Sequence, residues 1–388
     1  MASCGVRWHL RNCSPAVAAT VVLTSMIGAL PRSGQGEERL AFRAPDAYVQ
    51  RGKDLYVLSG GAFCRVNLES TKWSTLTTAF SPRNLVLYEH IAYPPRGERT
   101  FLLSEQGGRL RVTWGNLRDS SLTLCEPGDS THSLAGAEGT SLHVVEGLAA
   151  LNTGECVVFF SDETQSRNSA LHGLRLRLVE SGFESSAISG KGAPAACSDR
   201  YIWSDGVSVG YYGHLGVRGN VLGVWSSSTD EWTTQDVKAP RRDFGACAIG
   251  SRLVVVGGVW GSGQTWPCEA GLTFDLQSKA LTRPDFGVPP RIRPALCSMQ
   301  PERIVIFGGL ERDSQGGLRR LAGGSIHSAD GKMEKRLPWN SQLESVPEVR
   351  CATWGSRIVV WDSSGRESAL KAWVFDFDSE EWGLVAHE

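Results

Sequence analysis

The feature that most constrains the fold of this chain is an internal repeat of about 50 residues. Four cysteines mark it, at spacings of 50, 50 and 54 residues: Cys197, Cys247, Cys297 and Cys351. A short run of strand-like residues follows each cysteine. Glycine pairs end three runs of this kind, one of them earlier in the chain: Gly60-Gly61, Gly257-Gly258 and Gly308-Gly309. Self-similarity at a fixed period predicts a repeat architecture.

A second landmark lies further along each unit. An Asn, Asp or Ser is followed six positions later by a large hydrophobic residue, in the pairs Asn67 with Trp73, Ser226 with Trp232, Asp275 with Leu281, and Asp376 with Trp382. Such polar side chains start turns by bonding their own backbone. The Trp is expected to open an outer strand and to pack between neighbouring sheets.

These units predict an all-β chain. A period near 50 residues is too short for a domain but suits a meander of four antiparallel strands. One such sheet cannot bury both faces alone, so it stacks against copies of itself, and a closed ring protects nearly all strand edges. The 44 glycines and 13 tryptophans suit many short strands, and few stretches show the 3.6-residue period of long helices.

The units resemble kelch repeats, in which a hydrophobic run ends in Gly-Gly and a spaced Trp follows. The best match is 241–285, and 350–385 is also good, although Asp362-Ser363 stands where the glycine pair belongs. Residues 88–185 match by spacing alone. The resemblance implies a kelch-type β-propeller of four-stranded blades. Landmarks near residues 67, 116, 177, 226, 275, 328 and 376 give seven blades, and six remain the alternative.

The first 37 residues differ from the propeller region, 38–388. They contain Arg7, Arg11 and Arg32 and no acidic residue before Glu37, and an apolar run spans 16–30. Fifteen residues are too few for a comfortable membrane span, so no transmembrane segment is expected. A mitochondrial presequence is favoured over a secretory signal; a disordered or membrane-apposed tail is the third interpretation.

Charge gives no reason to expect nucleic acid as a partner, because the chain carries a formal net charge of -1. The ten cysteines contain no CxxC, and no close Cys/His pair has the spacing of a structural zinc site. The four repeat cysteines are expected at equivalent positions as small buried thiols that pack between blades. Unpaired cysteines also favour a reducing compartment.

No catalytic motif is visible: phosphate loop, GxSxG elbow and HExxH helix are all missing from the sequence. His132 and His143 lie in the poorly matching region, where a loop or strand-face role is expected. No catalytic residue, metal or cofactor is therefore predicted. Propellers of the kelch group include enzymes, so an enzyme acting on a sugar or small carboxylate in the central channel remains the runner-up.

One set of residues predicts ligand contact. A cation stands six positions before each of three repeat cysteines: Lys191, Arg241 and Arg291. Arg242, Arg293 and Arg350 lie close by, and Arg83 begins an earlier unit. Kelch propellers of ubiquitin-ligase adaptors are similar in placing arginines on the ligand-binding face. Such a ring would suit an acidic or phosphorylated segment; alternatively these residues are solvated, or pair with acids such as Asp243.

The leading functional prediction is a non-enzymatic protein-interaction module, a scaffold that holds a partner segment on its loop face. It would act as a stand-alone binder or as a subunit of a larger, mitochondrial complex. A substrate adaptor for ubiquitin ligation is a further alternative, although no BTB or F-box sequence accompanies the repeats. Secretory or cytoplasmic location is the alternative to mitochondria.

Overall fold

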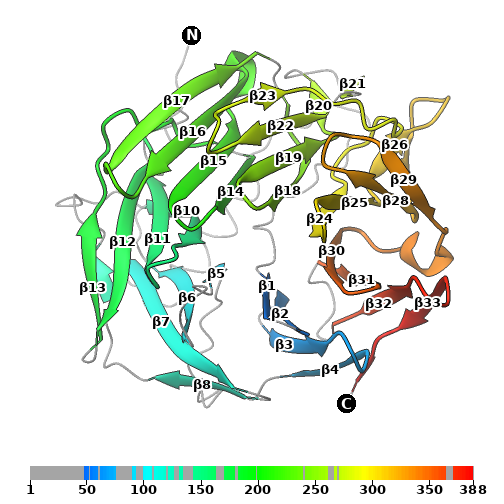
Figure 1. Ribbon diagram of the computed structural model, residues 1–388, viewed down its shortest axis with the longest axis horizontal. Coiled ribbons are helices and arrows are strands. Elements are labelled where there is room, and N and C mark those ends of the chain that lie inside the picture. The colour runs from blue at the N-terminus through cyan, green and yellow to red at the C-terminus, as the bar shows by residue number, and fades with distance from the viewer. Residues whose placement is uncertain are drawn as a thin grey trace, which may run out of the picture. The chain divides into compact units, whose positions relative to one another are not determined.

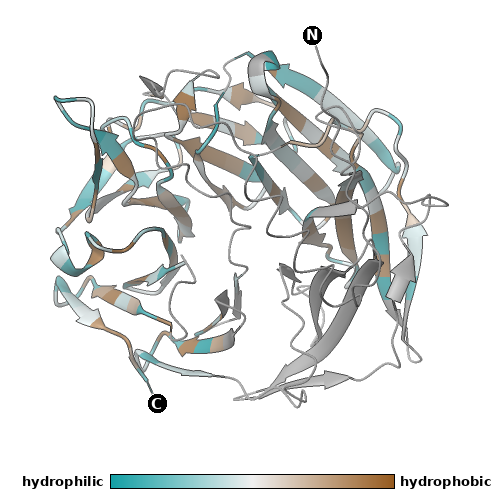
Figure 2. Cartoon of the chain, turned by 180° about the vertical axis from the view of Figure 1, so that it is seen from behind, coloured by the Kyte–Doolittle hydropathy of each residue, from teal (hydrophilic) through white to brown (hydrophobic). Residues whose placement is uncertain are grey.

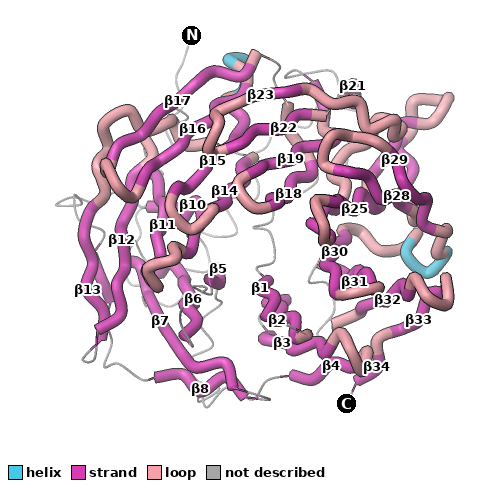
Figure 3. The backbone as a smooth tube through the Cα atoms, in the orientation of Figure 1, coloured by secondary structure: helices cyan, strands magenta, loops and turns pink. Residues whose placement is uncertain are grey.

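Short antiparallel strands joined by tight turns make up almost all of the structure. The computed structural model describes residues 48–51, 53–59, 62–75, 90–92, 99–106, 109–118, 121–125, 131–133, 143–162, 170–179, 182–197, 199–238, 241–260, 266–268, 271–363 and 370–387. These residues belong to one unit, Ala44–Glu388. The helices among the described residues are two single 3-10 turns, η2 (Gly216–Arg218) and η3 (Ser341–Leu343) (Figure 3). The all-β prediction is confirmed.

Most strands of the described residues belong to seven sheets, each built on four antiparallel strands that lie side by side in chain order. The first three sheets are β1 (Tyr48–Arg51), β2 (Asp54–Ser59), β3 (Ala62–Asn67), β4 (Lys72–Thr75); β5 (His90–Ala92), β6 (Arg99–Gln106), β7 (Arg109–Arg118), β8 (Ser121–Cys125), with β9 (Thr131–Ser133) also beside β7; and β10 (His143–Ala150), β11 (Cys156–Asp162), β12 (His172–Val179), β13 (Gly182–Ala187).

The next four sheets follow the same order. They are β14 (Arg200–Ser204), β15 (Ser208–His214), β16 (Asn220–Ser226), β17 (Glu231–Val237); β18 (Gly245–Ile249), β19 (Arg252–Val256), β22 (Leu272–Asp275), β23 (Leu281–Thr282); β24 (Ala295–Met299), β25 (Arg303–Phe307), β28 (Gly324–Ser328), β29 (Met333–Leu337); and β30 (Val349–Trp354), β31 (Arg357–Asp362), β32 (Ala372–Asp376), β33 (Glu381–Leu384). Figure 1 shows the first strand of each sheet nearest the common centre of this unit.

Two sheets carry an additional two-stranded ribbon between their second and third strands. In the fifth sheet the ribbon is β20 (Val259–Trp260) with β21 (Trp266–Pro267), and in the sixth it is β26 (Leu310–Arg312) with β27 (Leu318–Arg320). A last strand, β34 (Ala386–His387), runs parallel to β4 at the outer edge of the first sheet. The described part of the chain contains no helix long and apolar enough to span a membrane.

The polar landmarks form the turns that the sequence predicts. Oδ1 of Asn67 accepts the backbone N–H of Ser70 at 2.8 Å, and Oδ1 of Asp275 accepts that of Ser278 at 2.8 Å. Asp376 makes the related bond to Asp378 at 2.9 Å. The turn then requires one left-handed residue, four positions after each landmark: Thr71, Asp230, Lys279 and Glu380, with φ between 53° and 57°.

The spaced tryptophans pack onto the preceding sheet, as predicted. Trp232 of β17 lies edge-on to Phe159 of β11, with ring centroids 5.4 Å apart. Trp382 of β33 makes the same contact with Phe307 of β25 at 5.5 Å. Trp73 of β4 is buried in a cluster that includes Trp361 of β31. The preceding neighbour of the first sheet is therefore the seventh.

The glycine pairs occupy backbone positions that only glycine tolerates well. Gly257 and Gly258 end β19 with φ of 69° and 93°, and a Cβ on Gly257 would lie 2.3 Å from the Arg291 carbonyl oxygen. Gly308 and Gly309 end β25 in the same conformation. Positive φ and a close backbone neighbour together explain both pairs. Gly60 and Gly61 lie outside the described residues.

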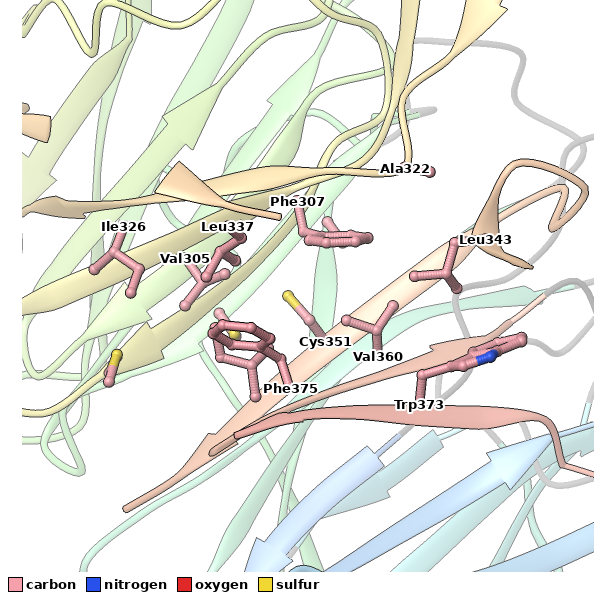
Figure 4. Close-up of a cluster of buried hydrophobic side chains, with 14 of the residues drawn as sticks. Val305, Phe307, Ala322, Ile326, Leu337, Leu343, Cys351, Val360, Trp373 and Phe375 are labelled. Atoms are coloured by element: carbon pink, nitrogen blue, oxygen red, sulfur yellow. The ribbon is translucent and has the colours of Figure 1, made fainter. Parts of the chain in front are cut away.

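The core lies between consecutive sheets. Figure 4 shows Val305 and Phe307 of the sixth sheet facing Val360 and Phe375 of the seventh, with Cys351 among them. Comparable clusters join the third sheet to the fourth, the fourth to the fifth, and the fifth to the sixth. Figure 2 shows the result as apolar bands on the middle strands and hydrophilic residues on outer strands such as β17.

One predicted equivalence is wrong. Cys247, Cys297 and Cys351 pair with Val254, Val305 and Val360 at matching positions of the first strands β18, β24 and β30. Cys197 instead precedes β14 by three residues, and Ile202 occupies the matching position, opposite Tyr211. The 50-residue spacing of Cys197 is coincidental, because the fourth sheet enters its first strand later than its neighbours do. All four thiols are nevertheless buried.

Candidate binding face at the entry ends of the sheets

The predicted ligand-contacting cations stand mainly where the chain enters the first strand of a sheet, an end called here the entry end. In the fifth sheet, Arg242 exchanges backbone hydrogen bonds with Val259 of β20, at 3.2 and 2.9 Å. In the sixth, Ile292 does so with Leu310 of β26, at 2.7 and 2.8 Å. Each ribbon is therefore anchored to the entry segment of its own sheet.

Arg241 and Arg291 do not form the exposed basic ring that the sequence predicts, because they are only 4% and 6% exposed. Nη1 of Arg291 donates to the carbonyl oxygen of Gly308 at 3.2 Å, and burial lowers the pKa of Arg291 to about 10. The backbone of Arg241 is held on both sides by the side chain of Asn220, at 2.6 and 2.9 Å. These arginines join neighbouring backbone segments.

Lys191 lies apart from these arginines. Its side chain is 82% exposed, and its Nζ lies 3.3 Å from Oε1 of Glu231, the first residue of the outer strand β17. The cause is the displaced register of Cys197, from which its position was counted. Lys191 is therefore a solvated residue at the outer edge of the fourth sheet. Arg83 lies outside the described residues.

Arg293 belongs to a ladder with acidic residues of neighbouring sheets. Nε of Arg293 lies 2.6 Å from Oδ1 of Asp243, and the backbone N–H of Asp243 donates to Asp199 at 3.1 Å. This ladder ties the fourth, fifth and sixth sheets together. Burial, and then the neighbouring charge of Asp243, raise the pKa of Asp199. The alternative interpretation, in which an arginine pairs with Asp243, is confirmed for Arg293.

Arg350 and Arg242 complete the predicted set. Nη2 of Arg350 lies 3.3 Å from Oε1 of Glu348, and both side chains are about one third exposed. Arg242 is partly buried beside β20. Of the six predicted cations that the structure describes, only Arg242, Arg293 and Arg350 are thus both partly exposed and at the entry end. Contact of these three with a partner stays a prediction.

A buried acid, Glu146, was missed in the sequence. It lies in β10 at a bulge, where the register shifts between Val145 and Gly147, and it is 6% exposed. Its carboxylate accepts a hydrogen bond from Ser161 and lies 2.6 Å from Nε of Arg200. Burial raises the pKa of Glu146, although Arg200 and Ser161 act in the opposite direction. No feature of the local sequence predicts the bulge, which turns this side chain inward.

Within the described residues, the entry ends of the fifth and sixth sheets also expose three large apolar side chains. Trp260 of β20 is 44% exposed, Leu318 of β27 is 51% exposed, and Trp339 in the connection after β29 is 49% exposed. The Trp339 ring covers Gly323, where an added Cβ would lie 3.4 Å from Cε3. Its indole N–H donates to Glu344 at 2.5 Å. These three side chains are called the apolar entry surface below.

Within the described ranges, no three His, Cys, Asp or Glu side chains are placed to hold a metal ion. The seven cysteines whose side chains are described are buried and form no disulfide with one another. Burial raises the pKa of Cys64 to about 11 and that of Cys197 to about 12, so these thiols stay protonated at neutral pH. His132 and His143 lie in β9 and β10.

No protein-family model matches the chain, and no curated protein matches it either.

Proposed function

We propose that the described sheets are the blades of a seven-bladed, kelch-type β-propeller. Three observations support this. Each of the seven sequence landmarks lies in the third strand of one sheet. The outer-strand tryptophans pack on the preceding sheet, and this rule pairs the first sheet with the seventh. Both glycine pairs end a second strand with positive φ, as the kelch pattern implies.

The function we propose for this propeller is a non-enzymatic protein-interaction module. The apolar entry surface carries the proposal, because its three large side chains are exposed on neighbouring ribbons and loops of the fifth and sixth sheets. Exposed aromatic side chains at one end of a rigid scaffold are typical anchors of a partner segment. The partly exposed Arg242 and Arg293 lie on the entry segments of the same two sheets and would favour an acidic segment.

A mitochondrial location belongs to the same proposal. It depends on the acid-free, Arg-bearing segment before Glu37, which lies outside the described residues. A fluorescent reporter fused to residues 1–40 tests it directly. Import of the reporter into mitochondria supports this location, and its entry into the secretory pathway contradicts it.

The interaction proposal is tested by affinity purification of the tagged full chain with quantitative mass spectrometry. The variant replaces Trp260, Leu318 and Trp339 with Ser. Its matched control is Trp354→Ser, because Trp354 is 39% exposed but lies at the β30–β31 turn, the opposite end of the sheets. Exposed substitutions of this kind change stability by about 0.5 kcal/mol or less each.

We expect the proteins retained by the wild-type chain to be retained by the Trp354 control and lost with the triple variant. Retention of the same proteins by all three forms would place the binding surface elsewhere. Recovery of no stable protein partner, together with turnover of a small molecule, would replace the module by the enzyme alternative.

A further inference from the structure

The entry ends of the first and seventh sheets bring together five side chains, called here the inner-edge cluster: Tyr48, Glu348, Arg350, Trp361 and Ser363. Arg350 and Trp361 are directly opposite on β30 and β31, so their side chains leave the same face of the sheet. Ser363 and Glu348 extend this pairing, with the Ser363 N–H donating to the Glu348 carbonyl oxygen at 3.0 Å. Tyr48 packs edge-on to Trp361, with ring centroids 5.2 Å apart.

Two polar groups of this cluster are buried without a hydrogen-bond partner among the described residues. The indole N–H of Trp361, a residue that is 0% exposed, has no hydrogen-bond acceptor in the described part of the chain. The hydroxyl of Ser363, a residue that is 5% exposed, also has none. An unpaired buried polar group destabilises the folded state, because its lost hydrogen bond to water is not replaced. A ligand that accepts both hydrogen bonds would remove this cost.

The cluster opens to solvent on one side. Tyr48 is 38% exposed, and the side chain of Arg350 is 30% exposed. Glu348 occupies one N–H of Arg350, at 3.3 Å, and a guanidinium carries five N–H groups. Trp361 and Ser363, with their two buried donors, therefore share one face of the sheet with Arg350, a partly exposed cation that has further donors.

The types of these groups define the class of ligand. An indole N–H and a guanidinium can only donate hydrogen bonds, and the two hydroxyls can do so as well. The single carboxylate, Glu348, is already paired with Arg350. A ligand must therefore supply acceptor atoms. A carboxylate offers two oxygens in one plane, which matches the fork of an arginine and fits beside aromatic rings.

We propose that the inner-edge cluster binds the carboxylate of an organic acid, with Trp361, Ser363 and Arg350 as its hydrogen-bond donors. This carboxylate belongs either to a free small acid or to the end of a peptide segment. The site is separate from the apolar entry surface, so its existence does not depend on the proposed interaction module.

The test uses the indole N–H signals of the 15N-labelled full chain. Trp361→Phe assigns the Trp361 signal, and Trp232→Phe assigns a matched control, because the Trp232 indole N–H is also buried without a partner in the described residues. The probes are sodium acetate, succinate and benzoate, with sodium chloride and sodium sulfate at equal ionic strength. A hexapeptide with a free C-terminus and its amidated form provide the peptide arm.

We expect the carboxylates, but not chloride or sulfate, to shift the Trp361 signal saturably and to leave the Trp232 signal in place. Ser363→Ala and Arg350→Gln should each weaken binding roughly tenfold or more, since each removes one hydrogen bond to a charged acceptor. Trp232→Phe should bind like the wild type. If the peptide with a free C-terminus binds more tightly than its amidated form and than the small acids, the site is assigned to a chain end. If the small acids bind more tightly than the free peptide, the site is assigned to a free acid.

The proposal is overturned if no carboxylate moves the Trp361 signal, or if chloride moves it equally. It is also overturned if Ser363→Ala and Arg350→Gln both bind with unchanged affinity. Either result leaves the apolar entry surface untouched, because its test measures retained proteins and uses different residues.

Discussion

Arg357 joins the last sheet to the first. Its Nη1 donates to the carbonyl oxygen of Leu68 at 2.9 Å, across 289 positions of sequence, while its Nε lies 2.9 Å from Oδ2 of Asp376. The same guanidinium also donates to the carbonyl oxygen of Glu69. One side chain thus connects two turns, one near each end of the described chain. The apolar cluster beneath it contains residues of both sheets.

Arg357→Met should therefore lower the free energy of unfolding by about 2 kcal/mol, the value of a few lost hydrogen bonds to a charged donor. Urea denaturation monitored by tryptophan fluorescence measures it. The matched control is Arg336→Met, because Arg336 is exposed on the outer strand β29. An equal effect of both substitutions would show that Arg357 does not stabilise the contact between the first and last sheets.

The left-handed turn residues allow a comparison of two glycine substitutions. Lys279 and Asp230 have nearly the same backbone conformation, with φ of 56° and 53°. Lys279→Gly should raise the free energy of unfolding by about 0.5 kcal/mol, because relief of the left-handed strain slightly exceeds the entropy cost of glycine.

Asp230→Gly should instead lower the free energy of unfolding by about 2 kcal/mol. The Asp230 carboxylate accepts the indole N–H of Trp225 at 3.0 Å and the backbone N–H of Ser189 at 3.1 Å. Thermal unfolding of the two variants side by side measures the difference. If both variants change the free energy of unfolding in the same direction, backbone strain alone determines the effect of glycine at these positions.

The stability of the contact between the third and fourth sheets should depend on the protonation of Glu146. Burial raises the pKa of Glu146 in the folded state above its usual value. The ionised carboxylate therefore costs stability at neutral pH, and this cost disappears as the pH falls through the raised folded-state pKa toward the unfolded-state value.

Glu146→Gln removes this titration. Relative to the wild type, the variant should be most stable at pH 7, and the difference should shrink as the pH is lowered toward 4.5. Urea denaturation of both proteins at several pH values measures the difference. A difference that grows on acidification would show that the Arg200 ion pair, at 2.6 Å, outweighs the burial of the carboxylate.

The buried cysteines should be unreactive in the folded protein. Burial raises the pKa of Cys64 to about 11 and that of Cys197 to about 12, so almost no thiolate is present at pH 8. Peptide mapping after a short treatment with iodoacetamide should find both unmodified in native buffer and modified in urea. Rapid modification of Cys197 in native buffer would show that the entry end of the fourth sheet opens readily.

The sequence by itself determined the local parts of this structure. Asn67, Asp275 and Asp376 form their turns through bonds to backbone groups two or three residues away, so a single unit contains all the information. The same holds for Gly257-Gly258 and Gly308-Gly309, whose positive φ values are a local requirement. The outer-strand tryptophans could also be predicted from the sequence, because the outer strand of each repeat unit has to pack against a neighbouring sheet.

Only the tertiary structure decided which of these features are accessible and which elements meet. Arg241 and Arg291 have the residue type of a ligand contact, but backbone segments brought in by neighbouring sheets bury them. Cys197 lies 50 residues before Cys247 but does not occupy the matching position of its strand. Sequence spacing does not reveal how many residues of connection precede a strand. Glu146 is turned inward by a bulge, and Arg357 reaches Leu68 only after all seven sheets have been placed. These particular contacts depend on the arrangement of the whole chain, so no single repeat unit encodes them.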